Sequence, residues 1–219
     1  MANLLAEFDF CQFYHIFNRT NNGELLFRSD ENRRYFLKLM ANKLHRYVQF
    51  YAYGLLDNLF HFAVSIRSEE EIISNIQKFP LKERTTTEQL FLESKSDNRN
   101  VHKFIAQQWS RVFNSYSQAY NKKYGRTGNL FHRPMKRSLI RKETKFTFLI
   151  YYIHHNSRKH GLVKSFENDN WHSNHEILSK EHTFLEKNYI MEWFGGKESF
   201  IEFHNSKQLE KDFLEFWIE

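Results

Sequence analysis

The sequence has little cysteine, proline or glycine. Its 219 residues include one cysteine, two prolines and seven glycines. The lone Cys11 excludes an intramolecular disulfide framework and a cysteine-based zinc cluster. Few prolines and glycines exclude collagen-like and linker-rich chains, while the 41% hydrophobic fraction suffices for a packed core. We therefore expect one large globular domain, or one domain with an extension.

Membrane and export signals are also missing. No apolar run approaches the roughly 20 residues that a membrane helix needs. The first twelve residues are mixed in character and include Glu7 and Asp9, unlike the apolar region of a signal peptide. We expect a cytoplasmic protein with no membrane partner.

Acidic residues are absent from a long central stretch. Residues 98–142 contain 11 Lys and Arg side chains and no Asp or Glu. The net charge of the whole chain is +6, so the residues outside this stretch have a net charge of −5. Charges of both signs usually intermix on a solvated surface, so this segregation indicates a polyanionic partner. Seven aromatic residues lie within the stretch, and rings beside positive charge suit single-stranded nucleic acid. The helical spacing of Trp109, Val112, Phe113 and Tyr116 favours a core position for those four.

Hydrophobic periodicity gives the expected order of elements. Strands are predicted at 13–20, 48–56, 61–67 and 130–140, and residues 57–58 form a turn or the lip of a strand. Helices are predicted after Ser29, after Ser68, at 101–120 and at 143–156, with a polar loop or insertion at 79–100. This order favours an α+β fold with an antiparallel sheet and helices packed on one face of it.

The end of the chain differs in charge from the centre. Residues 165–219 contain 12 acidic residues against five lysines. We expect residues 1–164 to form the main domain and 165–219 an acidic, helical C-terminal extension packed on it. The extension could mask the basic surface, bind a partner or simply pack.

Four segments, in this order, resemble one family, the single-tyrosine HUH transposases of the REP-associated and insertion-sequence branch. The resemblance spans roughly residues 13–204, and each segment is weakly specific when taken alone. The segments are 14–19 (YHIFNR) with 21–23 (NNG), 53–62 (YGLLDNLFHF), 121–131 (NKKYGRTGNLF) and 152–163 (YIHHNSRKHGLV), and the tail segment 193–197 (WFGGK) is also similar.

The resemblance implies a ferredoxin-like HUH fold and a defined chemistry. In that family two histidines on one strand, with a third ligand on a helix, hold Mg²⁺ or Mn²⁺ against single-stranded DNA. A tyrosine four residues before the helix ligand attacks the phosphate and forms a 5′-phosphotyrosine link. Alternate strand residues share a face, as do helix residues i and i+4, which accounts for the spacing.

Residue by residue, the resemblance places the nucleophile at Tyr152 and metal ligands at His61 and Asn156. The first histidine of the motif falls on Leu59, which cannot bind a metal. One imidazole and one neutral amide should hold Mg²⁺ or Mn²⁺ weakly or not at all without added oxygen ligands. The family's Asn-Pro is here Asn156-Ser157.

Other residues near the motif are candidates to replace the ligand missing at Leu59. Asp57 has the right strand parity, but on a regular strand its Cα lies about 13 Å from that of His61. His154 and His155 flank the helix ligand. For His15, on the first strand, a structural or DNA-facing role is favoured over metal binding.

We expect phosphate and base contacts from side chains of the basic stretch and the first turn. These residues are Arg19, Asn22, Lys122, Lys123, Arg126, Arg133, Lys136 and Arg137.

Three functions remain open. The first is a transposase that binds hairpin DNA and cleaves and rejoins it. The alternative is a catalytically impaired or domesticated derivative that recognises the hairpin without cutting. A more remote third is an RNA-binding protein, since a sheet with aromatic residues suits RNA as well. The protein is expected to act as a monomer or a homodimer.

Overall fold

A four-stranded antiparallel sheet organises the computed structural model, which describes residues 3–95, 99–159 and 169–206. The strands are β1 (Phe13–Arg19), β2 (Val48–Leu56), β3 (Leu59–Ile66) and β4 (Lys136–Ile140), in the order β2-β3-β1-β4. Each neighbouring pair is antiparallel, and Asp57-Asn58 forms the turn between β2 and β3. The predicted α+β class is confirmed.

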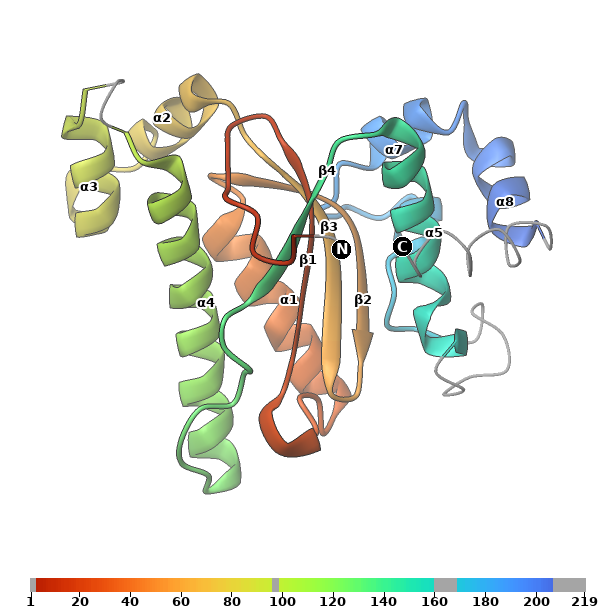
Figure 1. Ribbon diagram of the computed structural model, residues 1–219, viewed down its shortest axis with the longest axis horizontal. Coiled ribbons are helices and arrows are strands. Elements are labelled where there is room, and N and C mark those ends of the chain that lie inside the picture. The colour runs from red at the N-terminus through yellow and green to blue at the C-terminus, as the bar shows by residue number, and fades with distance from the viewer. Residues whose placement is uncertain (1–2, 96–98, 160–168, 207–219) are drawn as a thin grey trace.

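Helices cover both faces of the sheet. Helices α1 (Asp30–Leu44) and α4 (Val101–Tyr124) lie on one side, and α5 (Glu143–Lys159) lies on the other (Figure 1). Phe36 of α1 contacts Phe62 of β3, whereas Phe146 of α5 contacts Phe13 of β1. The expectation of helices on a single face was therefore wrong.

The physical reason is that the central strands are apolar on both faces. Seven of the eight residues of β3 are buried, in the run Phe-His-Phe-Ala-Val-Ser-Ile, so neither face alternates toward solvent. A strand buried on both sides requires a covering layer on each side. Residues of one parity meet α1 and α4, and His61, of the other parity, faces α5.

Helix α5 approaches the sheet very closely at Gly54 of β2. A Cβ atom built at Gly54 would lie 2.8 Å from the backbone oxygen of Ile153 and 3.3 Å from its Cγ2. Only a glycine allows this separation between the helix and the strand. Because Gly54 pairs with His61 across β2 and β3, this contact fixes α5 directly beside His61.

The expected loop at 79–100 contains more structure than its polarity indicated. After α2 (Glu69–Gln77) it forms the short 3₁₀ helix η2 (Leu81–Glu83) and then α3 (Thr86–Glu93). Thr85 and Glu88 make a capping box, and Glu88 also accepts hydrogen bonds from Arg46 and Tyr47. The buried carboxylate thus ties the insertion to the core.

The fourth strand is shorter than expected. Pairing with β1 begins only at Lys136, and residues 130–135 form a connection with one isolated bridge to Thr20. A proline at position 134 lacks the amide hydrogen that a strand ladder needs, which accounts for the late start.

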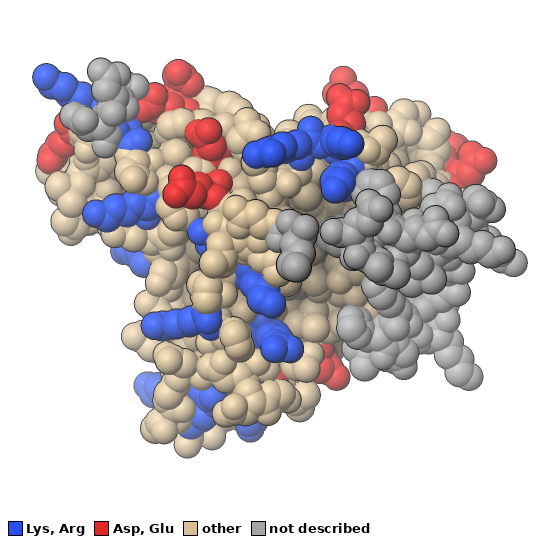
Figure 2. All heavy atoms as spheres, viewed as in Figure 1, with Lys and Arg blue, Asp and Glu red and all other residues tan. Residues whose placement is uncertain are grey.

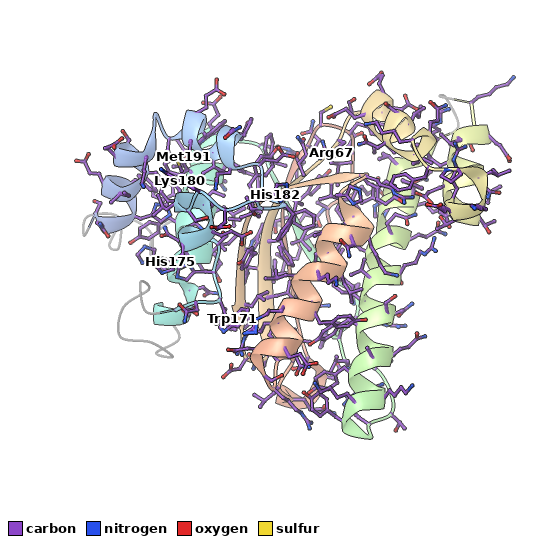
Figure 3. The ribbon with its side chains drawn as sticks, turned by 180° about the vertical axis from the view of Figure 1, so that it is seen from behind. Arg67, Trp171, His175, Lys180, His182 and Met191 are labelled. Atoms are coloured by element: carbon purple, nitrogen blue, oxygen red, sulfur yellow. The ribbon has the colours of Figure 1, made fainter. Side chains whose placement is uncertain are left out.

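The described part of the tail packs against the free edge of β2. It contains α6 (Asn174–Leu178), α7 (Lys187–Trp193) and α8 (Lys197–Asn205). The amides of Leu55 and Glu186 donate to the carbonyls of Trp171 and Phe50, each at 2.8 Å. Trp171 lies beside α1, and His175 and His182 lie in the tail (Figure 3). The expected domain boundary at 164/165 falls outside the described residues.

Over the described ranges, no helix is both long and apolar enough to cross a bilayer.

Candidate functional site

Two buried histidines meet on the face of the sheet that α5 covers. His15 lies on β1 and His61 on β3, and His15 Nε2 is 2.8 Å from His61 Nδ1. His61 is paired with Phe17, so the two histidines lie diagonally across the strands and their rings stack at 5.1 Å between centroids. Burial lowers the pKa of His15 to about 3, so this imidazole is neutral near pH 7. We call His15 and His61 the strand histidine pair.

Tyr152 of α5 lies directly over the strand histidine pair. Its ring meets His61 edge-on at 5.2 Å between centroids and His15 at 5.9 Å. Burial raises the pKa of the Tyr152 hydroxyl to about 12, so the group is protonated near neutral pH. The structure therefore brings together the expected nucleophile, the expected ligand His61, and His15, which the sequence reasoning had favoured for other roles.

Asn156 follows Tyr152 by one helical turn. Its side chain is fully buried, and neither its amide nitrogen nor its amide oxygen has a hydrogen-bond partner among the described residues. A buried amide that lacks partners is costly, about 1–3 kcal/mol, unless a group absent from the protein chain satisfies it. Asn156 therefore lies one helical turn after Tyr152, as the spacing in the sequence predicted.

The residues that the resemblance assigns do not fit Mg²⁺ or Mn²⁺. Leu59 supplies no donor, and these hard cations favour carboxylate, carbonyl and water oxygens. Within the described ranges, no three His, Cys, Asp or Glu side chains gather closely enough to hold a metal ion.

The side chains considered as replacements for Leu59 are held elsewhere. Asp57 Oδ1 accepts a 2.5 Å hydrogen bond from Arg33 at the exposed turn. The ring of His155 stacks on Tyr151 at 4.0 Å. Asp57 therefore stays at the turn with Arg33, and His155 packs within its own helix.

His154 belongs to a second buried pair. His154 Nδ1 is 2.8 Å from Nε2 of His204 on α8, and His154 Nε2 is 2.8 Å from Ser173 Oγ. His204 Nδ1 donates to the carbonyl of Phe200 at 2.8 Å, which fixes the donor of each bond in the chain. We call His154 and His204 the tail histidine pair, because it fastens the tail to α5.

Three of the expected DNA-contacting side chains have partners within the protein. Lys123 forms a 2.5 Å ion pair with Glu31, and Arg126 makes two hydrogen bonds of 2.5 and 2.9 Å to Glu24. Arg137 is half-buried and donates to the backbone oxygen of Ala6 at 2.6 Å. The positive charge of residues 98–142 is thus partly neutralised by Glu24 and Glu31, which come from the N-terminal part of the chain.

The other expected contacts face outward. Arg19, Asn22, Lys122 and Arg133 are exposed and Lys136 is half-buried, and within the described residues none of their four cationic groups forms an ion pair. On the face shown in Figure 2, Lys and Arg predominate over its lower part, along α4 and the connection to β4. This is the part of the surface most suited to a phosphate backbone.

Two hollows border this basic surface. One of about 400 Å³ lies between the 3₁₀ turn η1 (Asn21–Gly23) and the β2–β3 turn, and Arg19, Asn58 and His132 line it. The other, of about 490 Å³, lies beside α4 and includes Phe113 and Arg133 in its walls. Asn58 and His132 were missed from sequence, since they are brought to Arg19 only by the pairing of the strands.

The comparisons with known proteins agree with this fold. No protein-family model and no curated protein matches the chain. The fold is similar to the solved structure of a REP-associated tyrosine transposase bound to a REP hairpin. The TM-score is 0.55 over 84% of this chain and 90% of that chain, with 12% sequence identity. At this identity the likeness is one of fold.

Proposed function

We propose that the protein binds single-stranded DNA that folds into a hairpin. The observation that carries the proposal is the similarity of fold, over most of both chains, to a transposase whose structure contains a REP hairpin. The exposed cations Arg19, Lys122 and Arg133 support it, because contacts to phosphates supply most of the affinity for nucleic acid. We further propose that the protein binds this DNA in the cytoplasm. It would act there as a monomer or a homodimer.

Hairpin binding is tested with labelled DNA from the sequence that flanks the gene. We expect Arg133→Ala to weaken binding several-fold and to lower the slope of log affinity against log salt by about one. Lys180→Ala, on the exposed surface of the tail (Figure 3), is the matched control and should change neither quantity. Equal affinity for an RNA hairpin of the same sequence would favour the RNA-binding alternative.

A second candidate is cleavage of the bound strand by Tyr152. The observation that favours it is the position of the Tyr152 ring, edge-on to both His15 and His61. In this reaction the phenolic oxygen forms a bond to phosphorus, the bond to the 3′-oxygen breaks, and a phosphotyrosine and a 3′-hydroxyl result. The phenol must lose its proton, which its raised pKa of about 12 opposes.

The two candidates are separated by a search for a covalent adduct. The wild-type protein, Tyr152→Phe and Leu59→His are incubated with hairpin DNA and Mg²⁺ or Mn²⁺, then run on a denaturing gel. A covalent adduct that forms with the wild-type protein and disappears in Tyr152→Phe establishes that the protein cleaves DNA through Tyr152. Binding without an adduct, with cutting gained in Leu59→His, establishes a DNA-binding protein derived from a nuclease.

A further inference from the structure

The cavity of about 490 Å³ beside α4 lies between that helix and residues 128–135, the connection to β4. We call it the α4 cavity. Its volume falls within the roughly 300–1,000 Å³ that is usual for small-molecule sites. Trp109, Phe113 and Phe131 are among the residues that line it, and all three side chains are buried. The α4 cavity therefore has an apolar, aromatic floor that suits a flat ring.

Polar side chains from one face of α4 line the same cavity. Ser110, Asn114 and Ser117 are separated by four and three residues, so they lie one above another on the helix. None of the three side chains forms a hydrogen bond with another described residue. Serine and asparagine side chains can both donate and accept, so they can bond to the polar edge of a heteroaromatic ring.

The charges around the α4 cavity favour an anionic ligand. Among the described residues that line it there are two arginines and no Asp or Glu. One of them, Arg133, is exposed and forms no ion pair within the described residues. By contrast, the larger hollow beside the N-terminal segment is lined by Glu7 and Asp9 as well as by cations. A phosphate is therefore better accommodated in the α4 cavity, at the side of Arg133.

The outer wall of the α4 cavity is held in place by side chains of the neighbouring elements. The amide of Asn121 donates to the carbonyl of Gly128 at 2.9 Å, and Arg126 donates to the carbonyl of Asn129 at 3.1 Å. Asn18 of β1 donates to the carbonyl of His132 at 2.9 Å. These bonds form the wall before any ligand binds, which lowers the entropic cost of binding.

We infer that the α4 cavity binds one unpaired nucleotide, with its base beside Phe113 and Phe131 and its phosphate at Arg133. A base inside a duplex is stacked and paired, so only an unpaired base can enter. His132 lines both this cavity and the hollow beside Arg19, so the two adjoin, and a strand that leaves the cavity meets a second exposed arginine. The inference deepens the proposed hairpin binding and rests on it for the source of the nucleotide.

The first arm of the test measures hairpin affinity after each unpaired nucleotide in turn is replaced by an abasic one. We expect one position at which the replacement weakens binding about tenfold, as for a base that stacks on aromatic rings. Asn114→Trp places a large ring at the α4 cavity and should cause a similar loss with the intact hairpin. Its affinity should then no longer respond to the abasic replacement. Gln118→Trp, at an exposed amide one turn further along α4 and outside the lining, is the matched control and should behave as the wild type.

The second arm tests a free nucleotide as the source. The wild type and Asn114→Trp are each titrated by calorimetry with the four deoxynucleoside 5′-monophosphates. Binding of a mononucleotide to the wild type that is lost in Asn114→Trp, without any response of the hairpin to abasic replacement, assigns the α4 cavity to a free nucleotide.

The inference and the proposed function fail separately. A wild-type protein without affinity for the hairpin overturns hairpin binding, and the mononucleotide titration then decides the α4 cavity. If the hairpin binds, but neither an abasic replacement nor Asn114→Trp changes its affinity and no mononucleotide binds, the inference is overturned and hairpin binding stands.

Discussion

The two buried histidine pairs have the same nitrogen–nitrogen distance and different surroundings. The strand histidine pair joins β1 to β3 and lies under Tyr152. The tail histidine pair joins α5 to α8 and continues into Ser173 and Phe200. The comparison shows that the same short contact between imidazoles can join two strands of one sheet or fasten the tail to α5. The elements that carry the two histidines decide which of these it does.

Acid should disrupt the tail histidine pair most strongly. Burial lowers the pKa of His204 to about 4 and that of His154 well below its usual value, with nearby His172 adding to both shifts. The unfolded chain, with pKa near 6.5, then binds more protons than the folded one, so stability is full above about pH 6.5 and falls as the pH drops toward 4.

For His204 alone the expected loss between pH 7 and pH 4 is about 3 kcal/mol. Urea unfolding at several pH values measures it, and His182→Gln serves as the exposed control. A free energy of unfolding that stays constant from pH 7 to pH 4.5 would contradict the assignment of neutral, buried imidazoles.

Replacing one member of the tail histidine pair should also be costly at neutral pH. In His204→Leu the Nδ1–H of His154 loses its acceptor inside the protein. We expect a loss of about 3 kcal/mol, at the upper end for an unsatisfied buried donor. Unfolding by urea measures this loss. A free energy of unfolding equal to that of the wild type would contradict the assignment of His204 Nε2 as the acceptor.

Gly54→Ala should separate α5 from the sheet and affect the strand histidine pair selectively. The new methyl group would meet the backbone oxygen of Ile153, so the helix must move, at a cost of about 2 kcal/mol. Combining the change with Ile153→Ala should give little rescue, because the closest atom belongs to the backbone. Unchanged stability would contradict this.

The smallest effect on stability is expected from His15→Gln. Glutamine can still hydrogen-bond to His61, so we expect a loss of only about 1 kcal/mol in the metal-free protein. Urea unfolding at neutral pH measures this loss. A loss as large as that of His204→Leu would contradict the expectation that glutamine replaces the hydrogen bond to His61.

The fold could be predicted largely from periodicity and turn chemistry. The strands at β1 and β2 and the helices α1, α4 and α5 fall where alternation and helical spacing placed them. Helix α3 was missed because its stability comes from Glu88, buried against Arg46 and Tyr47, a contact of more than 40 residues in sequence separation. The second covered face was missed because a strand buried on both sides does not reveal which elements cover it.

The candidate site could be predicted only in part. Tyr152 and Asn156 lie four residues apart on one helix, so their common face follows from sequence alone. Arg126 and Lys123 looked like free cations, because Glu24 and Glu31, which pair with them, lie about 100 and 92 residues away. No local pattern reveals such long-range ion pairs.

The sequence by itself determined the α+β class, the basic central stretch and the spacing of Tyr152 and Asn156, because each depends on residue type or on local periodicity. Only the tertiary structure decided that His15 meets His61, that Gly54 admits α5, and that His154 belongs to the tail. Those three depend on strand register and on contacts between distant segments, where the energy of packing selects one arrangement among many that the local sequence allows.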